Sequence, residues 1–177
     1  LRSRSIPGLA GHRVLRREPP LGRGRADFLL LRGGQRCLLE VKSVTLVQDG
    51  VALFPDAPTT RGRTHLTHLI AARRRGLAAA VLFVIQRVDA RAFAPNQAAD
   101  PEFCATLRRA VRAGVRVQAL TCHVDAMGVR LAVSVPVLLD YRHRQRQQSR
   151  QRFPTATVPL SAGSVSRKRC LHPPVPP

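Results

Sequence analysis

Runs of hydrophobic residues along the first third of the chain predict short β-strands. Two of these runs, ADFLLL and CLLEVKSVTL, are joined by Arg32-Gly33-Gly34-Gln35, which is a strong hairpin signal. Asp49-Gly50 marks a second turn. The strands expected in this region are residues 14–18, 26–31, 37–46 and 51–54. We expect them to pair as an antiparallel meander.

Two later segments carry the three-to-four-residue hydrophobic period of amphipathic helices. The first, residues 60–75, ends in a run of arginines and stops at Gly76. The second opens with Asp100 as N-cap and Pro101 in its first turn, and it stops at Gly114. The residues expected to face inward are Leu66, Leu69, Ile70, Phe103, Leu107, Ala110 and Val111.

The remaining hydrophobic runs predict strands that alternate with these helices. Residues 77–86 form a run too continuous to have a wet face, which is typical of a buried strand. Residues 115–121 and 129–138 are further strands, and Pro136 weakens the last one. This order predicts an α/β fold, in which an antiparallel meander comes first and crossover connections follow.

The composition indicates a soluble protein of a reducing compartment, which we expect to be cytoplasmic. The chain has 177 residues, of which 44% are hydrophobic, so it can bury a core. Its longest apolar run, residues 77–85, is about half the length that a membrane span requires. The four cysteines form no C-x-x-C pair, which excludes a disulfide scaffold or a zinc ribbon as the organising principle. Cys37, Cys104 and Cys122 lie in apolar settings and are expected to be core residues.

The chain is strongly basic, with 30 Lys and Arg against 10 Asp and Glu and a net charge of +20. A field of this sign attracts polyanions, so DNA bound through its phosphates is the partner to expect. Aromatic residues make up only 4% of the chain, which argues against a platform for stacked bases. Only Lys42 and Lys168 are lysines, and GC-rich coding produces such an arginine excess without selection for a partner. That alternative stays open.

The character of the chain changes near residue 139. Residues 140–177 carry 8 basic groups and 1 acidic group, hold six of the 14 prolines and show no hydrophobic period. Such a segment cannot bury enough apolar surface to offset the cost of ordering, so a disordered tail should follow a domain at residues 1–139. Its Arg/Gln run is either an electrostatic arm on nucleic acid or sequence attached by a frameshift. Because the chain opens with Leu1, we expect a fragment of a longer protein.

Three charged residues interrupt the apolar strands of the hairpin. Glu40 and Lys42 lie two apart on one strand and so share a face, and the hairpin brings Asp27 beside Glu40. Because burial of an unpaired charge is costly, these groups must form a salt-bridged triad or share a divalent cation between the carboxylates. Mg²⁺ takes a few carboxylates plus waters and would polarise a phosphodiester there, while Lys42 orients or activates the nucleophile. A lysine in so arginine-rich a chain suggests that the strand requires a compact ammonium.

Two further sets of charged residues border this cluster. Glu18 is a third acid for the same face, or else a solvated charge. Arg61, Arg63 and His65 stand at the start of the first predicted helix, where amides of the helix end and basic side chains favour a phosphate contact. A solvated helix face is the alternative.

Several stretches of the chain resemble the sugar fermentation stimulation protein A (SfsA) family of bacteria. They are RADFLL, LLEVKSVTLV, DGVALFPDAPTTRGRTHL, LFVIQRVDARAFAPNQAADPEF and AGVRVQAL, and they run from about residue 6 to about residue 139. The resemblance implies a restriction-endonuclease-like core of the PD-(D/E)xK type, a mixed sheet with flanking helices. It implies that the D…E-x-K signature falls on Asp27, Glu40 and Lys42, with Glu18 matching an upstream acid. It also implies DNA binding and a regulatory role in sugar (maltose) metabolism.

The chain departs from the family in several ways. From the resemblance we expect that the amino-terminal OB-like domain of the family is missing, and any DNA contact that the domain provides would be lost with it. Thr60 stands where the family's T-E-R-G has an acid, which puts hydrolysis in doubt if that acid supports a metal. The tail after residue 139 matches nothing in the family.

These observations lead to three hypotheses. The first is a DNA-binding regulator of sugar metabolism that contacts the phosphates of DNA and needs neither a membrane nor a small-molecule cofactor. The second is a Mg²⁺-dependent DNA endonuclease in which Asp27, Glu40 and Lys42 are catalytic and Asp27, Glu40 and Glu18 hold the metal. The third is a truncated, non-functional gene product.

Overall fold

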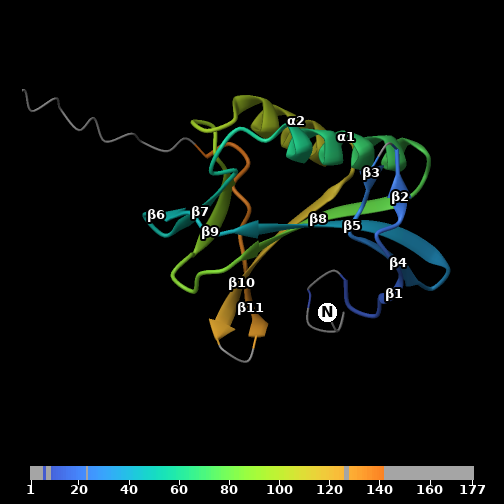
Figure 1. The fold of residues 1–177 in the computed structure, drawn as a ribbon, viewed down its shortest axis with the longest axis horizontal. Helices are drawn as coiled ribbons and strands as arrows, with labels where there is room; N and C mark the ends of the chain where they lie inside the picture. The colour runs from blue at the N-terminus through green and yellow to red at the C-terminus, as the bar shows by residue number, and fades with distance from the viewer. Residues whose placement is uncertain (1–5, 7–8, 23, 126–127, 142–177) are drawn as a thin grey trace, which may run out of the picture. The chain divides into compact units, whose positions relative to one another are not determined.

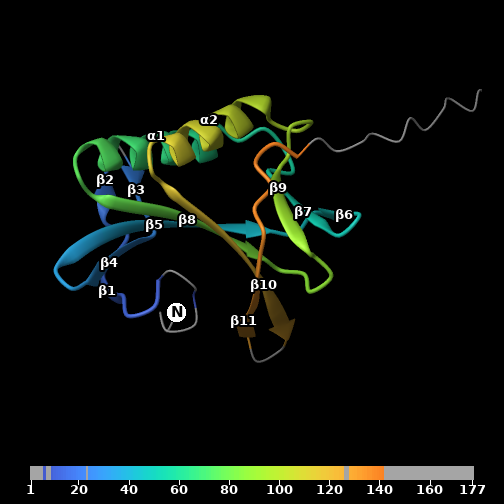
Figure 2. The ribbon, with the colours of Figure 1, turned by 180° about the vertical axis from the view of Figure 1, so that it is seen from behind.

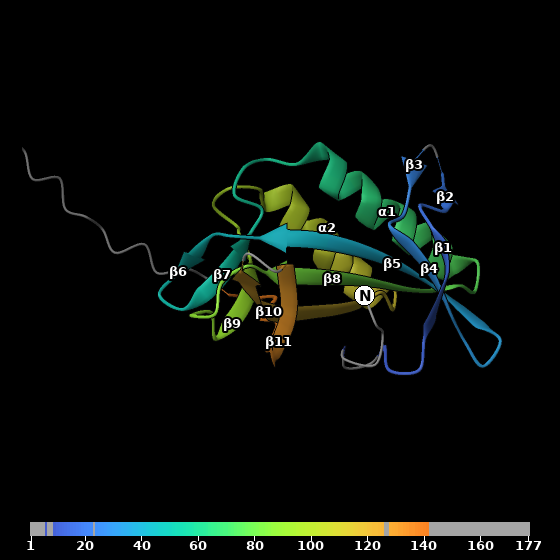
Figure 3. The same cartoon turned by 60° about the horizontal axis from the view of Figure 1, so that its bottom comes forward.

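In the computed structural model, residues 6, 9–22, 24–125 and 128–141 are described, and most of the strand residues lie in a six-stranded mixed sheet. The strands of this sheet, in their spatial order, are β1 (Arg13–Arg17), β4 (Phe28–Arg32), β5 (Gln35–Val44), β8 (Ala78–Ile85), β10 (Arg116–Asp125) and β11 (Gly128–Val135). Two helices, α1 (Thr60–Arg74) and α2 (Pro101–Arg112), run side by side over one face of the sheet (Figure 1, Figure 3).

The sheet begins as an antiparallel meander and continues through crossovers, as the sequence predicts. β1, β4 and β5 pair antiparallel, then β8 and β10 run parallel to β5, and β11 returns antiparallel. The β4–β5 turn uses Gly33 and Gly34 at φ values of 53° and 81°, a left-handed pair that matches the twist of a tight hairpin. The mixed α/β fold is therefore confirmed for the described residues.

Five shorter strands complete the described part of the chain, and the sequence predicts only one of them. They are β2 (Pro20–Leu21), β3 (Gly24–Arg25), β6 (Val47–Gln48), β7 (Val51–Phe54) and β9 (Ala92–Pro95). β2 and β3 form a small hairpin, while β6, β7 and β9 form a separate sheet at the end of the molecule away from the β4–β5 turn (Figure 2). Strands of two residues are too short to show an alternating pattern, which is why the sequence misses most of these elements.

The predicted helices and late strands are found with small shifts at their ends. Asp100 caps α2 through its side chain, as expected, and β11 stops at Val135, directly before Pro136. β10 runs on to Asp125, beyond the predicted end at residue 121. Of the residues expected to face inward, Ile70 and Val111 are only partly buried. Each helix packs on its neighbour as well as on the sheet, so residues beside the predicted stripes are buried too, namely Gly62, Ala72, Cys104 and Thr106.

The main hydrophobic core lies between the sheet and the helices. Phe83 of β8 stacks on Phe93 with ring centroids 4.1 Å apart and contacts Phe54 at 5.5 Å, and Leu66 and Leu69 of α1 close over the sheet. A second cluster covers the other face, where Leu30, Leu39 and Leu82 are among the side chains that pack beneath Ile6 and Leu9.

The cysteines of the described part are core residues, as predicted. Cys37, Cys104 and Cys122 are buried thiols, and burial raises the pKa of Cys104 to about 11. No helix of the described residues is long and apolar enough to cross a membrane. The predicted disordered tail, residues 140–177, lies outside the described residues from residue 142 onward.

Candidate functional site

Strand β5 carries Glu40 and Lys42 on the face that meets α1. Leu38 and Val44, which project from the same side of the strand as Glu40 and Lys42, belong to the core beneath the helices. The Glu40 side chain is 2% exposed, and its Oε1 accepts a hydrogen bond from Lys42 Nζ at 2.6 Å. The shared face inferred from alternation is thus present, and a buried carboxylate is paired with a half-buried ammonium.

Helix α1 adds His65 to this pair. Its Nδ1 is hydrogen-bonded to the same Glu40 oxygen, and its Nε2 lies 3.5 Å from Arg61 Nε, which can only donate. This arrangement fits the tautomer in which Nδ1 carries the proton and donates to Glu40. The ring predicted to contact phosphate is therefore turned toward the sheet, where it orients a carboxylate.

Asp27 reaches the same place from the residue just before β4. Since Phe28 pairs with Leu39, Asp27 follows in register opposite Glu40. Its Oδ2 accepts a short hydrogen bond of 2.6 Å from the amide of Val41, the residue between Glu40 and Lys42. The hairpin thus brings the Asp27 carboxylate to the stretch of β5 that carries Glu40, as the sequence predicts.

Glu18 is not brought into this cluster. Its backbone amide donates to the carbonyl of Asp27, but its carboxylate pairs with Arg25 at 2.9 Å, and its side chain is 69% exposed. Glu18 also has a left-handed backbone, with φ of 47°. The structure therefore places this predicted metal ligand on a solvated ion pair across the β2–β3 hairpin.

The cluster offers two carboxylates to a cation. Within the described ranges, no group of three or more His, Cys, Asp or Glu side chains is close enough to hold a metal ion. Mg²⁺ is commonly held by one or two carboxylates with waters completing its shell, and Ca²⁺ also prefers oxygen ligands. Asp27 and Glu40 each keep a second carboxylate oxygen apart from the hydrogen bonds described above. This donor set fits a hard divalent cation.

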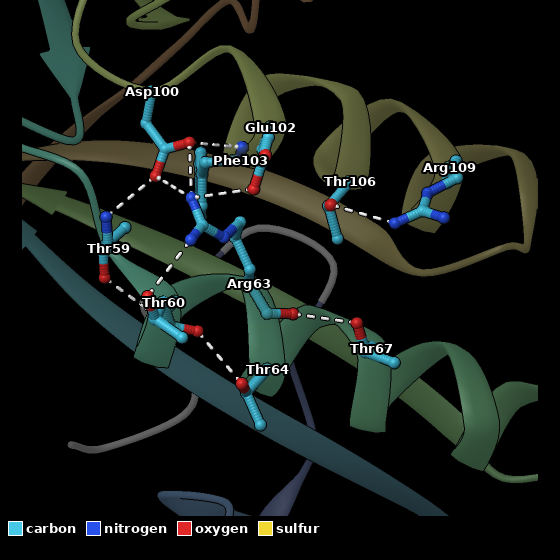
Figure 4. Close-up of polar contacts among 11 residues, drawn as sticks. Thr59, Thr60, Arg63, Thr64, Thr67, Asp100, Glu102, Phe103, Thr106 and Arg109 are labelled. Atoms are coloured by element: carbon cyan, nitrogen blue, oxygen red, sulfur yellow. Dashed lines mark hydrogen bonds and ion pairs between the residues drawn. The ribbon is translucent and has the colours of Figure 1, made fainter.

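Arg63, predicted to contact phosphate together with Arg61 and His65, is engaged in a bridge between the two helices. Its Nη1 lies 3.0 Å from both carboxylate oxygens of Asp100 and 3.3 Å from Glu102 (Figure 4). Its Nη2 donates to Thr60 Oγ1 at 3.1 Å. Of the predicted trio, only Arg61 stands fully exposed at the surface.

Asp100 is the centre of this bridge. Burial alone would raise the pKa of its carboxyl, but the amides of Thr59 and Phe103 and the Arg63 guanidinium outweigh burial and hold the pKa below its usual value. The sequence predicts the N-cap role, but it contains no signal for the link to Thr59 and Arg63. Through that link, Asp100 fixes the start of α1, the helix that carries His65.

The family model described as "Sugar fermentation stimulation protein RE domain" matches residues 1–128. The chain is 48% identical over 140 residues to a sugar fermentation stimulation protein homolog from Moorella thermoacetica, covering 78% of this chain and 60% of the relative. It is also 48% identical over 137 residues to a homolog from Chloroflexus aurantiacus, covering 77% of this chain and 53% of that protein.

A solved structure is similar as well. The structure of Pyrococcus furiosus SfsA in complex with Ca²⁺ aligns with a TM-score of 0.71 and 31% sequence identity, over 75% of this chain and 58% of that one. The chain therefore spans less than two thirds of the length of each of these three relatives.

Proposed function

The chain belongs to the sugar fermentation stimulation protein family, and from this premise we propose that it binds DNA through backbone phosphates at a divalent-cation site formed by Asp27 and Glu40. The observation that carries the proposal is the convergence of these two carboxylates with Lys42 on one stretch of β5. Carboxylates repel phosphate, so their presence on a basic domain is explained if a cation binds between acid and phosphate. The Ca²⁺ complex of the Pyrococcus furiosus relative supports this explanation.

Each residue of the cluster has a separate task in this proposal. Asp27 and Glu40 supply hard oxygen ligands, and the hydrogen bonds from Val41 and His65 hold the two carboxylates in place. Lys42, whose side chain is 16% exposed, can donate to a phosphate oxygen while it stays beside Glu40. A bound divalent cation would supply the positive charge that attracts a second phosphate oxygen.

The wider setting of the proposal is sugar metabolism, which the names of the relatives indicate. We include in it a restriction-endonuclease-like core, supported by the mixed sheet with its two helices and by the position of Asp27, Glu40 and Lys42 on the hairpin. Because the relatives are longer than this chain, their additional segments are potential sources of further DNA contacts and of sequence preference.

Fluorescence anisotropy with a labelled DNA duplex tests the proposal, using Ca²⁺ or EDTA at constant ionic strength. We expect Ca²⁺ to tighten binding of the wild type. Asp27→Asn and Glu40→Gln should lose this increase. Their affinity for DNA in Ca²⁺ should fall by more than about tenfold, because loss of a mere outer-shell partner of a metal already costs roughly that factor. Asp89→Asn, an exposed acid paired with Arg87, is the matched control and should keep the increase. Equal affinity of the wild type in Ca²⁺ and EDTA would contradict the proposal.

A second candidate function is Mg²⁺-dependent hydrolysis of DNA. Lys42 Nζ lies 2.6 Å from Glu40 on the same strand face, which places an ammonium where it can orient a nucleophile beside a carboxylate-held metal. Supercoiled plasmid incubated with Mg²⁺ and wild-type protein should be nicked, whereas plasmid incubated with Asp27→Asn should stay intact. Nicking by both proteins, or by neither, rejects hydrolysis at this site, and the anisotropy result stands independently of that outcome.

A further inference from the structure

A second polar site lies at the end of the sheet formed by the β4–β5 turn, the carboxyl end of α1 and the start of β10. A hollow at this end has a volume of about 610 Å³. Its polar lining comes from His12, Arg32, Gln35, Arg73 and Arg116. Its lining residues include neither Asp27, Glu40, Lys42 nor His65, and among its described lining residues there is no Asp or Glu. We refer to it as the arginine pocket.

Arg73 is held in a fixed position at this pocket. Its Nη1 donates to the carbonyl of Leu77 at 3.1 Å. Its guanidinium packs against Gly114, where an added Cβ would lie 2.9 Å from Nη2, and the φ of +84° there favours a glycine. Its Nε is buried and has no hydrogen-bond partner among the described residues, which is an uncommon and costly state for a charged group.

The other two arginines come from different elements and are exposed. Arg32 is the last residue of β4 before the hairpin turn and lies against Gly11, with its Nε 3.5 Å from the position of an added Cβ. Arg116 opens β10. Arginine, with its planar fork of donors, is suited to binding phosphate oxygens in pairs. Three guanidiniums around one hollow therefore favour an anion with several oxygens.

The floor of the pocket indicates what else a ligand would meet. It is formed by residues 78–80, which are alanines, and by Cys37. Burial raises the pKa of the Cys37 thiol, while the charges of Arg116 and Arg73 act in the opposite direction, so both arginines exert their field at this floor. No aromatic ring lies among the described lining residues to stack on a base. Recognition therefore depends on the anionic groups of a ligand.

We propose that the arginine pocket is a binding site for phosphate groups, carried either by a free phosphorylated molecule or by a nucleic-acid strand. A phosphate bound in the hollow would offer several acceptor oxygens to guanidiniums that come from three different elements. Because the pocket shares no residue with the Asp27–Glu40 cluster, this site does not depend on the proposed function.

Isothermal titration calorimetry with inorganic tripolyphosphate, at matched ionic strength, tests the site on the full chain. Arg32→Gln/Arg116→Gln removes two exposed guanidiniums of the pocket, and Arg36→Gln/Arg91→Gln removes two exposed guanidiniums outside it. Loss of two charge-assisted hydrogen-bonding groups should raise Kd by at least about tenfold in the pocket variant. The Kd of the control should stay within about twofold of the wild-type Kd, since salt screens exposed charges that lie outside the pocket. Thermal unfolding of both variants verifies that they are folded.

Two results would overturn the proposal. One is the absence of tripolyphosphate binding to the wild type, and the other is an equal loss of affinity in the pocket variant and the control, which would indicate a diffuse basic surface. A DNA titration of the same variants identifies the source of the phosphate. If a nucleic-acid strand binds in the pocket, the pocket variant alone should bind DNA more weakly. Its slope of log K against log salt should also be reduced by the equivalent of about two phosphate contacts. A free phosphorylated molecule predicts the same DNA affinity in both variants.

Discussion

Replacing Asp100 should loosen the start of α1 and lower the stability of the whole domain. The carboxylate accepts hydrogen bonds from the amides of Thr59 and Phe103 and pairs with Arg63, while its side chain is only 2% exposed. Asp100→Ala removes all of these interactions together. Asp100→Asn keeps a good N-cap but removes the charge and one acceptor oxygen.

The loss of stability in Asp100→Ala can be worked out from the groups that lose their partner. Loss of the N-cap costs about 1 kcal/mol. The Thr59 amide, left without its acceptor, adds about 1–3 kcal/mol. Arg63 adds about 1 kcal/mol, which is less than is usual for a hydrogen bond to a charged group because its side chain is 25% exposed and water can reach it. We therefore expect Asp100→Ala to lower the free energy of unfolding by about 3–5 kcal/mol and Asp100→Asn by about half as much.

Urea unfolding followed by circular dichroism measures both variants, first at pH 7 and then at decreasing pH. The pKa of Asp100 is lower in the folded protein than the usual value of about 3.9, so folding favours the charged form. Its contribution is complete above that usual value and is lost as the pH falls through the folded pKa. The difference between wild type and Asp100→Asn should therefore shrink below about pH 4.

Two results would refute this reasoning. If Asp100→Ala unfolds within about 0.5 kcal/mol of the wild type, the bridge between the helices contributes little, as many exposed ion pairs do. If the deficit of Asp100→Asn is the same at low pH as at pH 7, the charge of Asp100 is not what stabilises the bridge. Asp56→Asn, which changes an exposed acid, is the control and should unfold like the wild type at each pH.

Four further substitutions test other parts of the structure by the same urea titration. Lys42→Met should lower the free energy of unfolding by about 2 kcal/mol because it leaves the buried Glu40 with one partner fewer. Glu40→Gln should lower it by less than about 1 kcal/mol because Lys42 can turn to water. A larger loss in Glu40→Gln than in Lys42→Met would contradict the pairing. Gly34→Ala should cost about 1 kcal/mol because φ is 81° there, and an unchanged stability would argue against this turn. Phe83→Ala should cost about 3–5 kcal/mol, and a loss below 1 kcal/mol would mean that the aromatic core can collapse around the gap.

The elements that the sequence predicts well are those with a strong local cause. Gly33 and Gly34 can adopt the left-handed backbone that the hairpin needs, and Asp100 with Pro101 marks the start of α2. The continuous apolar character of residues 77–86 predicts a buried strand, and β8 lies between β5 and β10 in the sheet. β2, β3 and β6 are only two residues long, so their own sequences carry no comparable signal. β9 pairs with β7, which is distant in the chain, and no local pattern indicates that pairing.

The sequence predicts only those parts of the candidate site that lie on one hairpin. Alternation along β5 and the register of the turn suffice to bring Asp27 to the stretch that carries Glu40. The hydrogen bond from His65 crosses from a helix to the sheet, and the position of that helix is set by packing against α2 and by the Asp100 bridge. No local pattern contains this information, so the sequence alone predicts a phosphate contact for His65 and does not reveal its hydrogen bond to Glu40.

Of the two ways of satisfying the charged cluster that the sequence leaves open, a salt-bridged triad or a shared cation, the structure contains part of the first. Lys42 and His65 both bind Glu40, so a salt-bridged group exists, but its acid is Glu40 alone. Asp27 is bound by a neutral amide, and it forms no ion pair with any side chain in the described part of the chain. Within that part of the chain, the partner of the Asp27 carboxylate is therefore an amide and not a cationic side chain. In the proposed cation site, Asp27 would contribute more to cation affinity than to the stability of the fold, because its partner amide can be served equally well by a neutral oxygen.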